Sequence, residues 1–296
     1  MKFLVTGSTG LVGSQLVKDL VKSGHLVYSC YNNSKSYHGT PVHLDLANHS
    51  KIIETVASIR PDVILHLAAM TNVDLCEKEK ELALQINAKS TEILSKQAAK
   101  NGSFFVYVST DYVFDGNNGM KKESDTPNPV DYYGYSKYHG EIAVQDMASS
   151  WCIARTSTPF GMHDTRQSFP TFVIDNLQAK KEVSAIIDQY TSPTYVPNLS
   201  QMLIEISTRQ ILGVIHLAGA TKISRYDLAK LVAEKLGLDT NLLKQTNIKD
   251  MIHWTAKRPL DSSLDVSKAT QILNEKPLTI EEGLDRFIGE IKSKPN

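Results

Sequence analysis

The sequence predicts an α/β fold, in which a doubly wound parallel sheet of the Rossmann type carries a smaller C-terminal lobe. Two observations lead to this fold class. In the first half of the chain, short apolar runs alternate with amphipathic stretches, which is the pattern of repeated β-α-β units. A glycine-rich turn follows the first apolar run and opens the first amphipathic stretch, as in sheets that bind dinucleotides.

We interpret each apolar run of the first half as a strand. The predicted strands are 2–7, 25–31, 42–46, 62–68, 103–110 and 151–156. The run 62–68 is apolar almost throughout, which is typical of parallel strands buried on both faces. The amphipathic stretches predict helices at 11–24, 49–60, 78–101 and 132–149. Gly24 is expected at the C′ position of the first helix, and Pro61 ends the second.

The alternation becomes less regular after about residue 156. We expect helices at 168–180 and 197–207, and strands at 182–187 and 213–219. Ser224-x-x-Asp227 and Thr279-x-x-Glu282 have the spacing of capping boxes, so two further helices should begin there.

The predicted division into domains follows from this change in the alternation of strands and helices. Residues 1–155 are expected to form a dinucleotide-binding domain, to which segments near 194–219 return. Residues 156–193 and 220–296 are expected to form a substrate-binding lobe.

Composition narrows the class of protein. The chain has 296 residues, 41% of them hydrophobic, and a formal net charge of zero, so nothing points to nucleic acid or an anionic membrane as a partner. Its three cysteines are widely spaced, and we expect neither a disulfide framework nor a metal site. No apolar run has the length of a membrane span, and the N-terminus predicts a strand rather than a signal peptide. A reducing, cytoplasmic setting is therefore expected.

The glycine-rich turn is the first candidate binding site. Gly7, Gly10 and Gly13 follow a strand and open a helix with the spacing G-x-x-G-x-x-G. Glycines allow a tight turn, and the backbone N–H groups at the helix N-terminus can approach a pyrophosphate. We expect a dinucleotide cofactor to contact Gly7, Thr9, Gly10, Leu11 and Val12.

The end of the second strand indicates which dinucleotide binds. An acidic residue at this place usually holds the ribose 2′-hydroxyl of NAD(H). The chain has none there and offers Asn32, Ser34 and Lys35 instead. These polar and basic side chains favour the 2′-phosphate of NADP(H), with NAD(H) as the alternative. The other interpretation of Lys35 is a solvated loop residue.

A tyrosine four residues before a lysine marks the second candidate site. On one helical face the ammonium group can stabilise a tyrosinate and lower the phenol pKa, so that the tyrosine can exchange a proton with a substrate oxygen. The spacing occurs three times, at Tyr31/Lys35, Tyr133/Lys137 and Tyr226/Lys230. Because Tyr31 belongs to a strand end and Tyr226 to an amphipathic helix, context favours Tyr133.

With these two sites in place, the chain resembles the extended short-chain dehydrogenase/reductases, and within them the dTDP-4-dehydrorhamnose reductase group. The resemblance extends over nearly the whole chain. STDYVFDG and DQY-x-x-PT are fairly specific to the group, whereas the glycine turn and YxxxK are shared by the superfamily. The stretches that carry it are PDVILHLAAMTNVDLCE (61–77), INAKSTEIL (86–94), VSTDYVFDG (108–116), YYGYSKYHGE (132–141), RTS (155–157), DQYTSPTY (188–195), GVIHLAG (213–219) and RPLDSSLDVSK (258–268).

The resemblance implies a catalytic trio. Tyr133 would be the proton donor, and Lys137 would lower its pKa and bind the nicotinamide ribose. Thr110 would hydrogen-bond the substrate carbonyl oxygen. Ser109 is the alternative hydroxyl, but successive residues of a strand point to opposite faces, so only one of the two can face the site.

The resemblance also implies a set of binding positions, each with a packing role as its alternative. The cofactor would meet Asp45, Leu46, Leu67, Ala68, Ala69 and Asn87, together with Tyr133 and Lys137 of the catalytic trio. The sugar pocket would be lined by Thr71, Val73, Thr110, Asp111, Tyr112, Thr158 and Ser168.

The chain departs from the group's pattern in three places. Thr158 stands in RTSTPFG where the group has a tryptophan, and Ser168 stands where an asparagine is expected. Gln15 replaces a first-helix glutamate through which some members bind magnesium at a dimer contact, so no metal is expected there.

The activity implied by the resemblance is NAD(P)H-dependent reduction of the 4-keto group of a nucleotide-linked 6-deoxy sugar. The resemblance favours dTDP-4-dehydro-L-rhamnose as the substrate and dTDP-L-rhamnose as the product. It also leads us to expect a homodimer. A reductase of another keto sugar and an epimerase are the near alternatives. The alternative from another class is a non-catalytic subunit such as the regulatory β subunit of methionine adenosyltransferase, which has the same fold.

Overall fold

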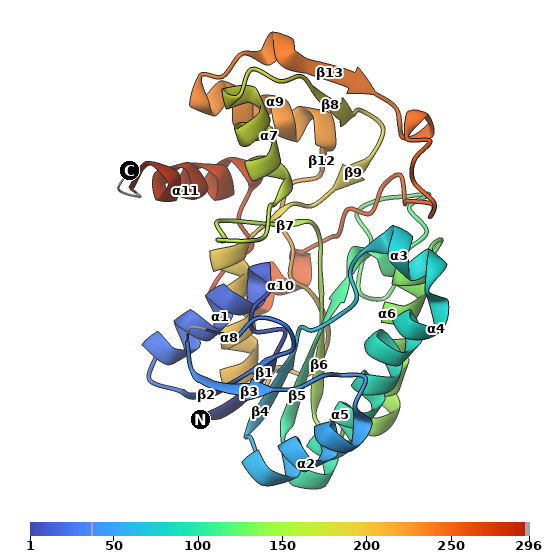
Figure 1. The fold of residues 1–296 in the computed structure, drawn as a ribbon, viewed down its shortest axis with the longest axis vertical. Helices are drawn as coiled ribbons and strands as arrows, with labels where there is room; N and C mark the ends of the chain where they lie inside the picture. The colour runs from blue at the N-terminus through green and yellow to red at the C-terminus, as the bar shows by residue number, and fades with distance from the viewer. Residues whose placement is uncertain (37, 294–296) are drawn as a thin grey trace.

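A computed structural model describes residues 1–36 and 38–293. A central sheet is flanked by helices, and a smaller lobe lies above it (Figure 1). The predicted fold class, a doubly wound parallel sheet with a smaller C-terminal lobe, is confirmed.

The central sheet contains seven strands in the described part of the chain, and every pairing between them is parallel. They are β1 (Lys2–Thr6), β2 (Leu26–Tyr31), β3 (Thr40–His43), β4 (Val63–His66), β5 (Phe104–Thr110), β6 (Trp151–Thr156) and β11 (Gly213–His216). Their order is β11-β6-β5-β4-β1-β2-β3. Successive strands are added on one side of β1 up to β3 and on the other side from β4 onward, so the strand order reverses between β1 and β4. Doubly wound sheets bind ligands at the carboxyl ends of the strands at such a point.

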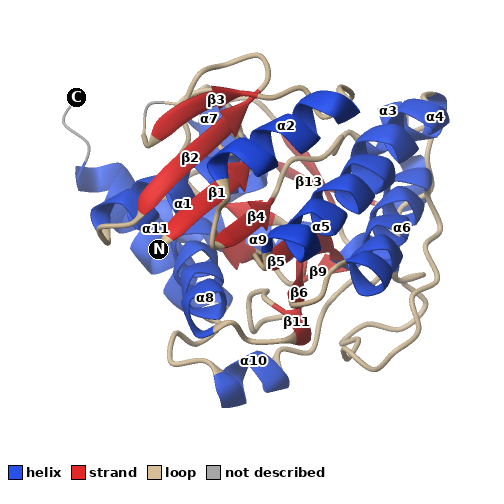
Figure 2. Ribbon diagram, turned by 90° about the horizontal axis from the view of Figure 1, so that it is seen from below, coloured by secondary structure: helices blue, strands red, loops and turns tan. Residues whose placement is uncertain are grey.

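Helices cover both faces of the sheet (Figure 2). One face carries α1 (Leu11–Lys22), α8 (Val196–Arg209) and α10 (Ser267–Ile272), and the other carries α2 (His49–Ile59), α5 (Ser90–Asn101) and α6 (Tyr132–Met147). Alternate strand residues serve the two faces, as a pleated strand requires. Phe3 and Val5 pack with α1 and α8, whereas Leu4 packs with α2 and α5.

The smaller lobe packs around its own apolar core, to which Phe160, Val173 and Leu284 belong. Its elements are β7 (Pro159–Phe160), α7 (Phe169–Gln178), β8 (Val183–Ile186), β9 (Tyr190–Thr191), β10 (Thr194–Tyr195), β12 (Ile223–Ser224), α9 (Arg225–Leu236), β13 (Leu243–Thr246) and α11 (Ile280–Ser293).

The division into a domain of residues 1–155 and a lobe of 156–193 and 220–296 stays a prediction. Two packing observations bear on it. Leu199 of α8 and Ile215 of β11 join the core of the sheet. Ala269 and Leu273 join the same core, so the stretch around α10 packs on the sheet and not in the lobe.

The helix predicted at 78–101 is confirmed in its main part, because the chain is helical without a break from Lys80 to Asn101, but it contains a π-helical turn and a separate short helix precedes it. The region contains α3 (Val73–Lys78), α4 (Lys80–Leu84), a π-helical turn η1 (Gln85–Lys89) and α5. Asn72 caps α3 by accepting a hydrogen bond from the Leu75 N–H at 2.9 Å, so the helical region starts before the apolar pattern indicates. The π turn holds Asn87, which is buried; such turns are frequent at functional sites.

Other predicted boundaries are close to those observed. Gly24 follows α1 with φ of +79°, in the left-handed region that glycine tolerates. The helix starts predicted at Ser224 and Thr279 are confirmed, since each hydroxyl accepts from the backbone N–H three residues on. The reciprocal bond of a capping box, from the N-cap N–H to the carboxylate, is formed at Thr279. The third strand ends at His43 rather than Leu46. The remaining short turns are η2 (Asp111–Val113), η3 (Thr240–Leu242) and η4 (Ile248–Asp250).

Within the described ranges, none of the helices combines the length and the apolar character needed to cross a membrane.

Candidate active site

The glycine turn lies against the backbone that follows β4. A Cβ added at Gly7, whose φ is +68°, would lie 2.7 Å from the backbone nitrogen of Ala68. A Cβ added at Gly13 would overlap the carbonyl oxygen of Gly7. Ser8 holds the turn to β2 by donating from its hydroxyl to the Cys30 carbonyl at 2.7 Å. Side chains at Gly7 and Gly13 would therefore separate α1, the turn and β4.

The turn leaves the N-terminus of α1 able to receive an anion. Gly10 is the N-cap residue, so no side chain caps the helix, and its first turn has no acidic residue. The first N–H groups of a helix lack intrahelical acceptors and carry the positive end of the helix dipole. The cradle at Thr9, Gly10, Leu11 and Val12 therefore fits the pyrophosphate of a dinucleotide.

The residues predicted for the far end of the cofactor lie at the ends of β2 and β3. Asn32, Ser34 and Lys35 are exposed in the loop after β2. Asp45 follows β3, where its carboxylate accepts from the Ala47 N–H at 2.9 Å, and Leu46 beside it is buried. The exposed lysine and the lack of an acid at the end of β2 fit a 2′-phosphate.

A buried chain of hydrogen bonds joins β1, β4 and α5 beneath the glycine turn. Thr6 Oγ1 accepts from the Ala68 N–H at 3.2 Å and lies 2.7 Å from His66 Nδ1. His66 Nε2 lies 3.0 Å from Thr91 Oγ1, which donates to the Asn87 carbonyl at 2.8 Å. Because the Thr91 hydroxyl proton is already used, His66 must donate from Nε2 and accept at Nδ1. Burial lowers the pKa of His66 to about 3, which fits this neutral ring.

The amide of Asn87 fixes the segment that follows Leu67, Ala68 and Ala69. Its Oδ1 accepts from the Met70 N–H at 2.8 Å, and its Nδ2 donates to the Met70 carbonyl at 3.0 Å and to Ser136 Oγ at 2.9 Å. The amide of Asn87 thus supports the loop and α6, and the contact of Asn87 with the cofactor stays a prediction.

Tyr133 lies in the first turn of α6, which Asp131 caps. Burial raises the pKa of Tyr133, and hydrogen bonding with Thr110 partly offsets the rise. The nearby carboxylates of Asp111 and Asp131 raise it further. Burial has the largest effect on this phenol, and the charges that act on it most strongly are negative, so the lowering of its pKa by Lys137 stays a prediction.

Lys137 ties α6 to β5. Its Nζ donates to the Val108 carbonyl at 2.8 Å and lies 4.0 Å from the centre of the Tyr107 ring. Burial lowers the pKa of Lys137 to about 7, and the carboxylate of Glu141 opposes this shift. The buried amine can donate to the Val108 carbonyl in either protonation state, so it fixes the strand just before Thr110.

Of the two candidate hydroxyls on β5, the structure favours Thr110. The Thr110 hydroxyl lies close enough to Tyr133 to lower the pKa of its phenol. Ser109 Oγ is buried and has no hydrogen-bond partner among the described residues. Strand alternation separates the two side chains, as predicted.

Asp111 is buried beneath these hydroxyls. Its Oδ1 accepts from Thr110 at 3.0 Å, and its Oδ2 accepts from Ser157 at 2.8 Å and from Ser262 at 2.5 Å. Burial raises the pKa of Asp111, while these three hydroxyls act to lower it. A carboxylate with three donors holds Thr110 in place; its direct contact with a sugar stays a prediction.

The other predicted sugar positions lie on different elements. The ring of Tyr112 packs edge-on against that of Tyr133, with centroids 5.9 Å apart. Thr71 is exposed after β4, and Val73 starts α3. Thr158 has φ of +40°, which is unusual for a β-branched residue.

Ser168, which is predicted to line the sugar pocket, caps a helix in the structure. It is the N-cap residue of α7, where its backbone N–H donates to Thr171 Oγ1 at 2.8 Å. Its contact with substrate stays a prediction.

The two other Tyr-x-x-x-Lys pairs do not join this site. Tyr31 ends β2 and Lys35 lies in the loop after it. Tyr226 packs against the core of the smaller lobe, and Lys230 lies 3.8 Å from the Glu234 carboxylate. Both positions agree with the prediction that Tyr133, and neither Tyr31 nor Tyr226, belongs to the candidate site.

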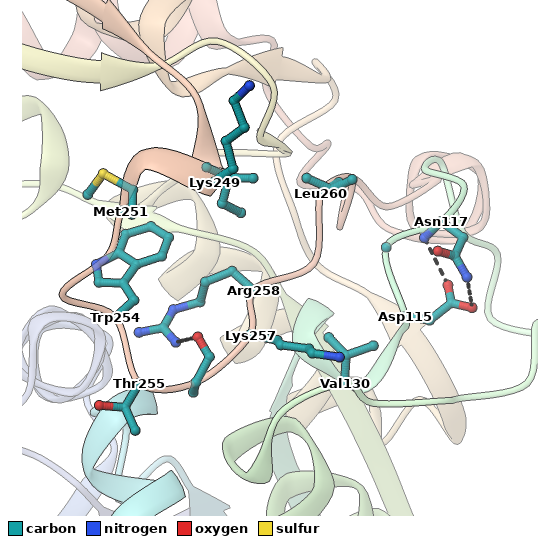
Figure 3. A pocket seen from close by; sticks show the side chains of 13 residues that line it. Asp115, Asn117, Val130, Lys249, Met251, Trp254, Thr255, Lys257, Arg258 and Leu260 are labelled. Carbon is teal, nitrogen blue, oxygen red and sulfur yellow. Dashed lines mark hydrogen bonds between the residues drawn. The ribbon is translucent and has the colours of Figure 1, made fainter.

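Sequence reasoning missed a cavity beside the site (Figure 3). It has a volume of about 410 Å³, and the chain around Trp254 and Arg258 forms one wall, with Asp115 and Asn117 across the opening. Val130 also lines it, directly before Asp131. The stretch RPLDSSLDVSK (258–268) marks this region in the sequence. The partner of Arg258, Asp74, lies 184 residues away, so their contact could not be predicted.

Comparisons with known proteins find chains that are similar over nearly the whole length. A family model described as "RmlD substrate binding domain" matches residues 1–293. The dTDP-4-dehydrorhamnose reductase of Escherichia coli (strain K12) is 33% identical over 281 residues, which are 92% of this chain and 91% of that protein. The methionine adenosyltransferase 2 subunit beta of Xenopus tropicalis is 30% identical over 278 residues, covering 91% and 81%.

A solved structure is similar over the same length. It is the dTDP-4-dehydrorhamnose reductase of Bacillus anthracis str. Ames in complex with NADP, which superposes with a TM-score of 0.89 at 30% identity. The match covers 98% of this chain and 99% of that one.

Replacing Gly13 by alanine should weaken NADPH binding by at least about tenfold, equivalent to about 1.4 kcal/mol. The added methyl group would overlap the Gly7 carbonyl and displace the turn. The dissociation constant can be measured by NADPH fluorescence titration. Gly289→Ala is the matched control, because Gly289 is also helical but has nothing within 4 Å of an added Cβ. Equal affinities of the two variants would contradict this account of the turn.

The burial of Lys137 should appear in the pH dependence of stability. Between about pH 7 and the ordinary value of 10.5, the unfolded chain carries a proton on Lys137 that the folded chain lacks. The free energy of unfolding of the wild type should therefore rise with pH relative to that of Lys137→Met, by about 1.4 kcal/mol per pH unit. Urea titrations between about pH 7.5 and 9.5 measure the difference. Parallel curves would show that Lys137 keeps an ordinary pKa.

Proposed function

The chain belongs to the RmlD substrate-binding domain family, and we propose that it reduces the 4-keto group of a nucleotide-linked 6-deoxy sugar with NADPH. The sequence-based assignment to the extended short-chain dehydrogenase/reductases and their dTDP-4-dehydrorhamnose reductase group is confirmed. The specific reaction that we propose converts dTDP-4-dehydro-L-rhamnose to dTDP-L-rhamnose.

One observation carries the proposal. Tyr133 and Thr110 approach each other at the carboxyl end of β5, and the glycine turn lies at the carboxyl end of β1 in the same parallel sheet. A carbonyl oxygen held by the two hydroxyls would therefore face a nicotinamide bound along that edge. Tyr133 would act on this oxygen as an acid, and Thr110 would donate to it when its hydroxyl proton turns away from Asp111 Oδ1.

The chain's residues account for the proton in this reaction. NADPH, when bound, supplies the hydride that reaches the carbonyl carbon. The raised pKa of Tyr133 keeps its phenol protonated near neutral pH, so that it can donate to the oxygen as negative charge develops there. Asp111 orients Thr110 through the 3.0 Å hydrogen bond, and Lys137 fixes the strand behind them.

NADPH is the favoured cofactor of this proposal, and NADH is the alternative. Exposed Lys35 at the end of β2 and the lack of an acid there support NADPH, as does the NADP complex of the similar Bacillus anthracis protein. A homodimer stays a prediction.

A regulatory role is the second candidate. The similarity to methionine adenosyltransferase 2 subunit beta covers 91% of this chain, and Thr158 stands where the reductase group has a tryptophan. The two proposals differ in a measurable way, because a regulatory subunit would bind a partner protein and consume no NADPH.

Replacing Tyr133 by phenylalanine should lower kcat for dTDP-4-dehydro-L-rhamnose by about 10²- to 10⁴-fold, because the developing alkoxide loses its proton donor. NADPH should still bind to the variant, since the phosphate cradle does not include the phenol. Oxidation of NADPH, followed by its absorbance, measures the rate.

Tyr226→Phe is the control, since Tyr226 has the same spacing to a lysine but packs in the lobe core. It should retain the activity of the wild type. A Tyr133→Phe variant that is as active as Tyr226→Phe would overturn the role of Tyr133.

A further inference from the structure

One wall of the cavity in Figure 3 is a strap, residues 249–258, that lies outside regular helices and strands apart from the end of η4. The strap is fixed at both ends. At one end the Ile248 N–H donates to Asp188 Oδ1 at 2.8 Å. At the other end Pro259 packs against Gly116, where an added Cβ would overlap the proline.

Between these ends, the hydrogen bonds that the strap donates to distant parts of the described chain all go to one carboxylate, that of Asp74. Asp74 Oδ1 accepts from the backbone N–H groups of Thr255 at 2.8 Å and Ala256 at 2.9 Å. Asp74 Oδ2 accepts from the Arg258 guanidinium at 2.8 Å. Asp74 lies on α3 of the sheet side, so these contacts join two parts of the fold that are 181 to 184 residues apart.

The charges of Asp74 and Arg258 suit a lasting contact between the Asp74 carboxylate and the strap. Burial alone would raise the pKa of Asp74, but the Ala256 N–H and the Arg258 guanidinium lower it below its ordinary value. Asp74 is therefore ionised at neutral pH. The guanidinium lies 4.7 Å from the centre of the Trp254 ring and is 8% exposed, so ring and carboxylate together fix its plane.

The latched strap gives the cavity a cationic wall. Lys249, Lys257 and Arg258 line the cavity, and Asp74 accepts a hydrogen bond from only one of them. Asp115, across the opening, lies 3.9 Å from Lys121. The wall therefore keeps an excess of positive charge, which suits a diphosphate, next to Trp254, which suits a base.

We propose that Asp74 is the positioning residue for the nucleoside diphosphate end of the substrate. Its bonds to the strap, which we call the latch, hold the strap as one wall of the cavity, so that Lys257, Arg258 and Trp254 meet the diphosphate while Tyr133 meets the sugar. The proposal rests on the proposed function for the identity of the sugar. The latch itself depends only on the contacts of Asp74.

Hydrogen exchange tests the latch without any turnover. In Asp74→Ala, amide exchange of Thr255 and Ala256 should accelerate by at least about tenfold, because both lose their acceptor. Asp74→Asn should give an intermediate rate, since its carbonyl oxygen can still accept from the two N–H groups. Asp146→Ala is the control, because Asp146 is exposed on α6. Unchanged exchange in Asp74→Ala would overturn the latch.

Binding and kinetics test the positioning role. Asp74→Ala should raise the dissociation constant of dTDP by at least about tenfold and leave that of NADPH within about twofold. With dTDP-4-dehydro-L-rhamnose, KM should rise while kcat stays within about threefold. A general loss of structure would weaken NADPH binding too, and an effect on kcat alone would assign Asp74 to the chemical step; either result would overturn the positioning role.

Failure of this inference is distinguishable from failure of the proposed function. If the wild type does not turn over the sugar but dTDP binds and depends on Asp74, the substrate assignment fails and the latch stands. If the wild type turns over and Asp74→Ala matches it in KM and in dTDP affinity, the latch inference fails and the reductase stands.

Discussion

The candidate site depends on the close approach of two backbone segments, the glycine turn after β1 and residues 67–68 after β4. Side chains are excluded from this contact, since a Cβ at Gly7 would lie 2.7 Å from the Ala68 nitrogen. The approach places the N-terminus of α1 at the carboxyl ends of the neighbouring strands β1 and β4. Thr6 and His66 reinforce it from below, because Thr6 accepts from the Ala68 N–H and bonds to His66. The same hydrogen-bond chain continues to Asn87, which holds α6 and thus Tyr133 in register with the turn.

Buried polar groups, rather than apolar packing, set the chemistry of the site. Asp111 gathers three hydroxyls, and Lys137 donates to the Val108 carbonyl in a fully buried position. Such networks are rigid when every member has a partner. The raised pKa of Tyr133 is a consequence of the same burial. The phenol is thereby kept as an acid, which suits protonation of a developing alkoxide more than abstraction of a proton.

Much of this architecture could be predicted from local patterns. Apolar runs identified the strands, the glycine spacing identified the cradle, and the position of Tyr133 after β5 separated it from Tyr226. Features that depend on tertiary contacts could not be predicted. The π turn at 85–89 lies within a stretch that looks like one regular helix, and its Asn87 bonds to Met70 and Ser136, which are distant in the sequence. The Asp74–Arg258 contact joins residues 184 apart, and the pKa of Tyr133 depends on burial that a spacing rule cannot include.

Transfer of deuterium tests the central claim most directly. NADPH that carries deuterium at the transferable position of the nicotinamide is incubated with the protein and dTDP-4-dehydro-L-rhamnose, and the sugar product is examined by mass spectrometry and proton NMR. We expect one deuterium in the hexose and loss of the signal of the proton at C4. Recovery of sugar without deuterium at C4, under conditions in which the protein binds NADPH, would contradict the assignment of this site as a 4-ketoreductase.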